Sequence, residues 1–334
     1  VSVSWGGSGI DQDLVLAVGI QGGDGVEFTN NRVNVNTKGS VGSYPTVDAV
    51  MIHSAADILI KGNNITHVDT TTDDSSRYYY SLDIYSTNAT VEENNIIVNT
   101  TAGVDRAGTA YPIQVTGPAV ITIKNNNLTA VSKGPVAGIY ASNWAGAATL
   151  IVEDNNIDVT GYATTGNYAL VAGIEAEIDL LKAYNNTIVV TNGAEFNESN
   201  QAYGISMTSS YVSGVPAAEI MDNNITVNGN YAVYYVKASN TNITDNDLYA
   251  YYLVGDDAAV IVEGDNDTIE NNRPYQANIT VSGDNVWTGS DATVTVSVPN
   301  ATGTVTIEVN GKSYDVELDE NGTATKDIPA EDLV

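Results

Sequence analysis

Residues 120–131, which read VITIKNNNLTAV, decide the fold of this chain. Two short runs of alternating apolar and polar residues stand on either side of a group of asparagines, and this arrangement recurs along the sequence. An Asn-Asn pair ends at Asn31, Asn64, Asn95, Asn127, Asn156, Asn186 and Asn224, in steps of 29 to 38 residues. A period of this size is typical of a solenoid.

Each repeat contains three runs that predict β-strands. Around Asn126-Asn127 these runs are residues 120–123, 128–131 and 136–140, and their alternation is the two-residue period of a strand with one buried face. Three strands in each repeat, without a crossover helix, predict an all-β chain folded as a parallel β-helix of about nine coils. Each strand then pairs with its counterpart one coil away, at roughly 4.8 Å.

We expect the Asn pair to lie at a sharp bend between two strands, because Asn tolerates the left-handed backbone region. An amide side chain both donates and accepts hydrogen bonds, so asparagines stacked coil upon coil form a ladder. The predicted members of this ladder are Asn31, Asn64, Asn95, Asn127, Asn156, Asn186 and Asn224.

The repeated bend resembles the asparagine ladder of the right-handed parallel β-helix proteins in the pectin-lyase-like superfamily. The resemblance covers residues 1–273. It implies the fold and says little about function, because lyases, hydrolases, phage tailspikes and adhesins all use it.

Residues 274–334 have a different pattern. The runs at 292–298, 304–309 and 313–318 alternate, and Asn310-Gly311 is a two-residue hairpin signal. This predicts an antiparallel β-sandwich, which resembles the immunoglobulin-like repeats of prokaryotic surface proteins. A complete domain of that kind has about 100 residues and this segment only about 60. We therefore expect an incomplete sandwich, whose last strands lie beyond Val334 or come from a neighbouring chain.

The composition excludes several functions. The chain has 12 Lys and Arg residues against 41 Asp and Glu, a net charge of −29, so binding to nucleic-acid phosphates is excluded. The chain has no Cys, which excludes disulfides and thiolate metal sites. Its apolar runs are all shorter than the ~18 residues of a transmembrane helix, so we expect no membrane-spanning segment.

Polysaccharide cleavage by a lyase or a glycoside hydrolase is the enzymatic alternative for this fold. A glycoside hydrolase needs two carboxylates close together. Outward positions of the third strand class are mostly Gly, Ser and Gln, and Asp83 and Glu175 stand several coils apart. We therefore expect no catalytic residue and no tight cluster of outward carboxylates. His53 and His67 are expected to be surface or loop residues.

Two acidic segments bear on metal binding. Asp245-Asn246-Asp247 and Asp265-Asn266-Asp267 are similar to fragments of a Ca²⁺ loop, but they lack the spacing of an EF-hand. As substituted members of the Asn bend they need no metal. We expect no cofactor and no metal site, with a structural Ca²⁺ as the open alternative.

The chain has 20 Tyr and 2 Phe. Strict alternation predicts that Tyr80, Tyr111, Tyr203 and Tyr231 face the interior and form a column in the core. The opposite parity predicts that Tyr79, Tyr140, Tyr234 and Tyr252 face solvent, on the same side as Trp144 and Tyr211 in loops. Exposed aromatic rings suit stacking against sugars, so these six residues are the predicted ligand-binding set: Tyr79, Tyr140, Trp144, Tyr211, Tyr234 and Tyr252. The alternative is that they only fill a flat surface.

Asn-x-Ser/Thr sequons are frequent. Those on the predicted ladder are expected to be buried in a bend. Sequons in predicted turns or loops are the expected glycan acceptors: Asn88, Asn99, Asn197, Asn300 and Asn321.

A β-helix followed by an immunoglobulin-like module, in an acidic chain without Cys, resembles the adhesin-like surface proteins of methanogenic archaea. The resemblance implies an extracellular, non-enzymatic cell-surface glycoprotein that acts as a rigid stalk in cell adhesion. Its expected partners are cell-surface glycans or other cells. Self-association into filaments, through the coil ends or by strand completion, is the structural variant of this hypothesis.

Overall fold

The computed structural model describes most of the chain: residues 2–6, 14–38, 46–53, 56–70, 78–85, 88–100, 109–117, 120–142, 148–162, 170–193, 201–207, 217–228, 231–236, 239–250, 260–263, 265–274, 280–283, 286, 289–298, 303–319 and 322–333. Two compact units are present, Val1–Pro274 and Tyr275–Val334.

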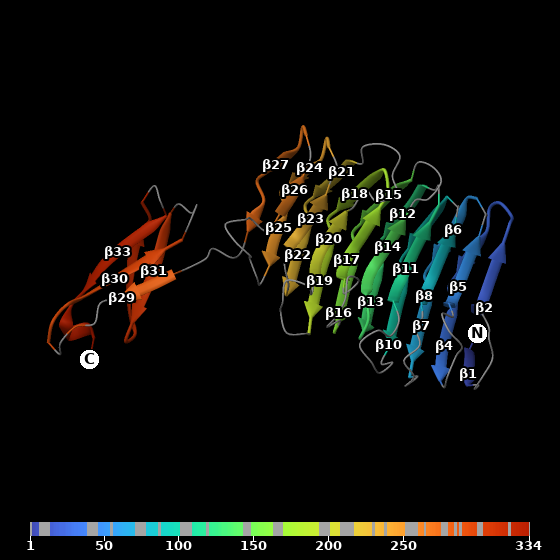
Figure 1. Cartoon of the computed structure of the whole chain (residues 1–334), viewed down its shortest axis with the longest axis horizontal. Coiled ribbons are helices and arrows are strands. Elements are labelled where there is room, and N and C mark those ends of the chain that lie inside the picture. Colours follow the sequence, from blue (N-terminus) through green and yellow to red (C-terminus); the bar gives the residue numbers. More distant parts are fainter. Residues whose placement is uncertain are drawn as a thin grey trace. The chain divides into compact units, whose positions relative to one another are not determined.

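The first unit is a parallel β-helix, as the repeat predicts. Its described strands form three parallel sheets, in which each strand pairs with the strand three places further along the chain. Figure 1 shows these strands following one another in chain order.

Ten strands form sheet I: β1 (Ser2–Gly6), β4 (Arg32–Lys38), β7 (Asn64–Asp69), β10 (Asn95–Thr100), β13 (Asn127–Ser132), β16 (Asn156–Gly161), β19 (Thr187–Asn192), β22 (Asn224–Asn228), β25 (Asp247–Ala250) and β28 (Arg273–Pro274). Nine strands form sheet II: β2 (Leu14–Gln21), β5 (Thr46–His53), β8 (Tyr78–Tyr85), β11 (Thr109–Thr116), β14 (Val136–Ser142), β17 (Leu170–Glu177), β20 (Gln201–Met207), β23 (Tyr231–Val236) and β26 (Val260–Glu263). Nine strands form sheet III: β3 (Glu27–Thr29), β6 (Ile58–Lys61), β9 (Ala89–Glu92), β12 (Val120–Lys124), β15 (Thr149–Glu153), β18 (Leu180–Tyr184), β21 (Ala217–Met221), β24 (Asn242–Thr244) and β27 (Thr268–Glu270).

The core lies between the three sheets. Sheets I and III follow the two-residue period, so that in β13 the side chains of Leu128, Ala130 and Ser132 are buried and the residues between them are not. The inward Val, Ile, Leu and Ala side chains form one buried cluster from Val33 to Ala250. Burying each large apolar side chain contributes about 1.5–3 kcal/mol, and this cluster is the main favourable term in the folding of the unit.

Sheet II interrupts the two-residue period. In β8, Tyr79 and Leu82 are both in the core cluster although they are three residues apart. The residue at the interruption is small or is proline in successive strands: Ala49, Ser81, Pro112, Gly138, Gly173 and Gly204. A Cβ on Gly173 would lie 2.3 Å from Cγ2 of Ile188 and 2.5 Å from the carbonyl oxygen of Gly204, so the chain passes too close to its neighbours there for a side chain.

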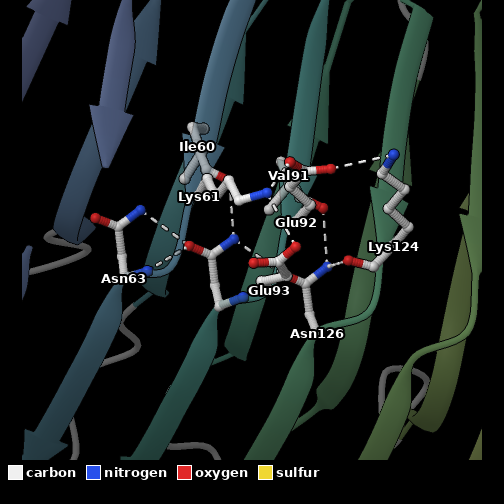
Figure 2. A network of polar contacts seen from close by, with 9 residues as sticks. Ile60, Lys61, Asn63, Val91, Glu92, Glu93, Lys124 and Asn126 are labelled. Carbon is white, nitrogen blue, oxygen red and sulfur yellow. Dashed lines mark hydrogen bonds and ion pairs between the residues drawn. The ribbon is translucent and has the colours of Figure 1, made fainter. Parts of the chain in front are cut away.

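An asparagine ladder runs along the bend between sheets III and I. The residue before each ladder asparagine has a positive φ, as at Asn125 (55°) and Asn185 (51°). Each ladder amide donates from Nδ2 to Oδ1 of the next member at 2.8–3.0 Å, through Asn31, Asn63, Asn94, Asn126, Asn155, Asn186, Asn223, Asn246 and Asn272. Figure 2 shows Asn63 and Asn126 in this row.

The predicted ladder was wrong by one residue at most positions. Of the predicted members, Asn31 and Asn186 belong to the ladder, whereas Asn64, Asn95, Asn127, Asn156 and Asn224 are the next residues, which begin strands of sheet I. In the other five pairs the first Asn turns its amide into the bend, where Asn126 also donates to the carbonyl of Val91 at 2.9 Å. The second Asn of those pairs then starts a strand and faces outward. In Asn30-Asn31 and Asn185-Asn186 the first Asn has the positive φ and the second is the ladder member.

A row of charges lies beside this ladder on the outer side of sheet III (Figure 2). Glu92 forms ion pairs with Lys61 at 2.8 Å and with Lys124 at 3.1 Å, and Lys61 also forms one with Glu93 at 2.9 Å. These four residues alternate in sign across neighbouring coils. Since these groups are exposed to solvent, water and salt screen the pairs and they contribute little to stability.

The described part of the second unit contains two small antiparallel sheets. The strands β29 (Thr280–Gly283), β30 (Ala292–Ser297) and β33 (Thr323–Ile328) form one, and β31 (Thr304–Val309) and β32 (Lys312–Glu317) form the other. The predicted hairpin at Asn310-Gly311 is confirmed: it joins β31 to β32, and both residues have positive φ. The described part ends with a 3₁₀ turn, Ala330–Asp332.

Candidate functional site

A group of buried and exposed polar side chains lies on the outer face of sheet II, over β5 and β8. The interrupted period places two outward columns side by side there. One column passes from Asp48 to Tyr80 and Tyr111, and the next passes from Met51 to Asp83, Gln114, Tyr140 and Glu175. We call Asp48, His53, Tyr78, Tyr80, Asp83 and Tyr85 the Tyr–Asp patch.

Two carboxylates stand at the centre of this patch. Asp48 is 1% exposed and Asp83 is 7% exposed. Within the described residues, Oδ1 of each is buried without a hydrogen-bond partner. Burial and the negative charge of Asp83 raise the pKa of Asp48 to about 8, so that Asp48 is largely protonated at neutral pH. Desolvated acids of this kind are frequent at functional sites.

His53 lies beside Asp83 at the edge of the patch. Its Nε2 is 3.1 Å from Oδ2 of Asp83, one coil further along the chain. Its ring also lies against the ring of Tyr85, with 5.2 Å between the ring centroids and a 48° tilt. The imidazole of His53 remains about a third exposed and can contact a ligand.

A stack of tyrosines adjoins these acids. The rings of Tyr80 and Tyr111 are 5.8 Å apart and nearly parallel, and those of Tyr111 and Tyr140 are 4.7 Å apart. The stacked faces cover one another, so the stack offers little ring surface to a ligand. Burial raises the pKa of all three hydroxyls. The aromatic surface open to a ligand belongs instead to Tyr78 and Tyr85, which are 40% and 43% exposed.

A second pair of acids lies at the far end of the stack. Burial, together with the charge of Glu177, raises the pKa of Glu175 to about 8. The hydroxyl of Tyr140 donates to Oε2 of Glu177 at 3.3 Å. Three strand spacings separate Asp83 from Glu175, about 14 Å. The two acid pairs are therefore separate groups. Asp83 and Glu175 were predicted to stand several coils apart, and they do.

No tight cluster of outward carboxylates was expected, and Asp48 and Asp83 bear on that prediction because the charge of Asp83 raises the pKa of Asp48. A protonated acid beside a carboxylate is the pair that glycoside hydrolysis uses. Asp48 is almost wholly covered, however, and a bound sugar can reach Tyr78, Tyr85 and His53 far more readily. The patch is therefore better suited to binding than to chemistry at Asp48.

The residues of the predicted ligand-binding set lie in different environments. Tyr79 was predicted to face solvent and is 1% exposed in the core, because the period is interrupted two residues after it. Tyr80 and Tyr111 were predicted to be in the core column and lie on the outer face instead. Tyr140 is on the outer face, half-buried in the stack. Tyr234 is in β23 and its side chain is not described; Trp144, Tyr211 and Tyr252 lie outside the described residues.

Asp48, Tyr78 and Tyr85 were not among the predicted site residues, and the proximity of His53 to Asp83 was not predicted. The only signal for these residues is the coil register, in which His53 is the partner of Tyr85 and Met51 the partner of Asp83. The intervals between successive Asn pairs vary from 29 to 38 residues, because the connecting segments differ in length. The register therefore cannot be read from a constant sequence spacing.

His67 was predicted to be a surface or loop residue and is fully buried. It belongs to β7 and packs inside the β-helix with its ring 5.4 Å from that of Tyr79. Burial lowers its pKa to about 3, so it is neutral. It lies inside the unit and cannot contribute to the Tyr–Asp patch.

Described residues of both acidic segments take part in hydrogen bonds of the coil bends. Asn246 is a fully buried member of the ladder, and Oδ1 of Asp267 accepts a hydrogen bond from the backbone N–H of Thr241. In the described part of the chain, no three His, Asp or Glu side chains are grouped as metal ligands would be. No helix among the described residues has the length and apolar character that crossing a bilayer requires.

Comparisons with protein-family models, with curated proteins and with solved structures gave no match to this chain.

Proposed function

We propose that this protein is a non-enzymatic, extracellular protein of the adhesin-like or cell-surface fibre kind, in which a rigid β-helix carries a glycan-binding surface. The observation that carries the proposal is the exposure of Tyr78 and Tyr85 at the two ends of β8, with the His53–Asp83 pair beside Tyr85 on the same sheet. In this proposal the β-helix is right-handed, with about nine coils, and the second unit is part of an immunoglobulin-like module that extends the stalk.

The stiffness of such a stalk has a physical source in the first unit. Each described strand is paired with the coil before or after it, and the ladder from Asn31 to Asn272 adds a second line of hydrogen bonds along the bend. Bending the unit would stretch both at once. A surface carried on this scaffold keeps its geometry without a ligand, which lowers the entropic cost of binding.

The chemistry of the patch favours an uncharged, hydroxyl-rich ligand. Tyr78 and Tyr85 offer ring faces for the apolar side of a sugar, and carboxylate or imidazole groups accept or donate hydrogen bonds to its hydroxyls. With a net charge of −29, the chain repels polyanions. We therefore propose neutral cell-surface glycans as partners, in preference to uronic-acid polymers.

The test is a panel of neutral and anionic polysaccharides and of whole cells, scored for retention of the protein and for release of soluble sugar fragments. Retention on a neutral glycan without fragments is the expected result. Tyr85→Ala should weaken retention about fivefold to tenfold, since an aromatic contact is worth about 1–1.5 kcal/mol. Tyr162→Ala is the matched control, because Tyr162 is also exposed (47%) and lies outside the patch. Equal retention of the two variants would count against the patch.

Self-association is part of the same proposal. Open strand edges pair with other strands, and the second unit has several residues that are only partly buried around Val296 and Ile307. A neighbouring chain that supplied a strand would cover them. Light scattering over a range of concentrations tests this, and a monomer at all concentrations would remove the filament variant while leaving glycan binding intact.

The second candidate function is polysaccharide cleavage by a glycoside hydrolase, and the pairing of Asp48 with Asp83 is the observation that favours it. Asp48 would act as the acid, since its raised pKa keeps a proton available, and Asp83 as the charged partner. Fragments released by the protein and abolished by Asp83→Asn would establish this function. Retention that survives Asp83→Asn, with no fragments from either protein, would exclude it.

A further inference from the structure

We infer that Asn64, Asn127 and Asn224 are acceptors of N-linked glycans, which would stand in one line across the starts of the strands of sheet I. The inference rests on the extracellular location proposed above. It changes which sequons are accessible, because the ladder occupies the residue before each of these asparagines.

The three asparagines share one position in the coil. Each is the first residue of its strand in sheet I, and the register joins Asn64 to Asn95, Asn95 to Asn127, Asn127 to Asn156, and then through Thr187 to Asn224. Asn64, Asn127 and Asn224 are exposed. The adjacent ladder residues, Asn63, Asn126 and Asn223, are at most 2% exposed.

Their sequence context is the same in each case. The middle residues of the sequons are Ile65, Leu128 and Ile225, which are fully buried in the core. The hydroxyl residues are Thr66, Thr129 and Thr226, which lie on the outer side of sheet I with the asparagines. A modifying enzyme needs the Asn amide and the Thr hydroxyl together, and the strand period places both on the solvent side.

The chain contains its own negative controls. Asn95 and Asn156 occupy the same column but are followed two residues later by Ile97 and Asp158, which have no hydroxyl. Position in the fold is thus held constant while the sequon is present or absent.

Modification at this column is compatible with the existing hydrogen bonds. Nδ2 of Asn127 donates to Oδ1 of Asn95 at 2.9 Å, and Oδ1 of Asn127 accepts from Nδ2 of Asn156 at 2.9 Å. Transfer from a lipid-phosphate-linked oligosaccharide forms a bond between Nδ2 and the anomeric carbon and breaks the bond from that carbon to phosphate oxygen. The lipid phosphate leaves and Nδ2 loses one proton. One N–H remains, so both hydrogen bonds can persist.

The spacing leaves room for all three glycans. Asn64 and Asn127 are two strand spacings apart, about 10 Å, and Asn127 and Asn224 are three apart, about 14 Å. Bulky, hydrated sugars at these strand starts would shield this part of the surface from proteases.

The sequons expected to be acceptors are less uniform. Asn88 is exposed just before β9, but Asn99 lies within β10 and its Oδ1 is buried. The expectation that Asn99 lies in a turn was wrong. Asn197, Asn300 and Asn321 lie outside the described residues.

The test is glycopeptide mass spectrometry on protein secreted by cells that carry out N-glycosylation. We expect glycans at Asn64, Asn127 and Asn224 and none at Asn95 or Asn156. Thr129→Ala should remove the glycan at Asn127 alone, and Asp158→Thr should add one at Asn156. Thr122→Ala, an outward threonine outside any sequon, is the control and should change no site.

Protease treatment of intact cells separates this inference from the proposed function. Protein that is digested at the cell surface yet carries no glycan at the three asparagines would overturn the inference and leave the proposed function standing. Protein that is protected inside the cell and carries no glycan would overturn both.

Discussion

The hydroxyl of Tyr79 donates a hydrogen bond of 2.8 Å to Oδ2 of Asp69 inside the β-helix. Tyr79 is 1% exposed and Asp69 is fully buried. The other carboxylate oxygen of Asp69 accepts a hydrogen bond from the hydroxyl of Thr37. Strands β4 and β8 therefore each supply a hydroxyl donor to one buried acid of β7, and these hydrogen bonds offset the cost of burying it.

Tyr79→Phe removes the hydroxyl and keeps the ring. We expect the free energy of unfolding to fall by about 1–3 kcal/mol, because a buried acceptor loses one of its donors. Urea or thermal unfolding measures the effect. Tyr85→Phe is the control, since Tyr85 is 43% exposed and should change stability by less than about 0.5 kcal/mol. Equal losses for the two variants would contradict the interior placement of Tyr79.

Tyr79 and Tyr80 also show where sequence reasoning failed. The repeat, the three strands in each coil and the parallel pairing all follow from the two-residue period and its recurrence, because one buried face repeats in every strand. Which tyrosines face inward does not follow from that period. One extra residue in each strand of sheet II reverses the inward–outward alternation of the side chains before it. The small residues at Gly138, Gly173 and Gly204 were the available signal, since they precede the inward Ile of each strand.

Gly173→Ala tests this interruption. The added Cβ would lie 2.3 Å from Cγ2 of Ile188 and 2.5 Å from the backbone oxygen of Gly204, and the backbone cannot yield as a flexible side chain can. We expect a loss of about 1–3 kcal/mol, as for overpacking of a core.

Gly283→Ala is the matched control for that variant. Gly283 is also in a strand, with its closest contact to a new Cβ at 3.8 Å, so the substitution should be nearly neutral. Gly173→Ala with unchanged stability would mean that sheet II is not as tightly packed at this column.

Asn126→Ala and Asn127→Ala distinguish the observed ladder from the predicted one. Asn126 donates to the Val91 and Lys124 carbonyls and to Asn155, and accepts from the amide of Asn94. Its loss leaves several buried groups without partners, and we expect at least about 2–4 kcal/mol of destabilisation. Asn127 is exposed, so its loss should cost under about 0.5 kcal/mol. The reverse order in unfolding experiments would restore the predicted register.

The Tyr–Asp patch lies beyond single-sequence reasoning for a different reason. Asp48 and Asp83 are 35 positions apart in sequence (83 − 48), and the coil register at that point is 32 (Asp48 with Tyr80). Their proximity is a diagonal relation between neighbouring strands. Single-sequence reasoning fixes the existence of strands more securely than their relative register, because register depends on the length of every connecting segment.

His67 should make the protein acid-sensitive. Its pKa is about 3 in the folded state and about 6.5 in an unfolded chain. Between those values the unfolded state binds more protons, so stability is lost as pH falls from 6.5 toward 3. In His67→Phe, the acid-induced loss of roughly 3–5 kcal/mol in the free energy of unfolding should be absent. Unfolding free energies of both proteins at pH 7 and pH 4 measure it, and parallel pH curves would contradict a buried neutral imidazole.

Asp48 should act in the opposite direction. Its pKa is about 8 in the folded state and 3.8 in the reference state, so between those values the folded state binds more protons. Stability that is present below pH 4 is therefore lost as pH rises toward 8. Asp48→Asn removes the titration, and relative to the unsubstituted protein the variant should gain on the order of 3–5 kcal/mol between pH 5 and pH 8. Met51→Leu, a neutral change on the same face, should leave the slope unchanged. A variant whose stability tracks that of the unsubstituted protein at both pH values would show that Asp48 is ionised in the fold, and with it the case for Asp48 as a proton donor would be lost.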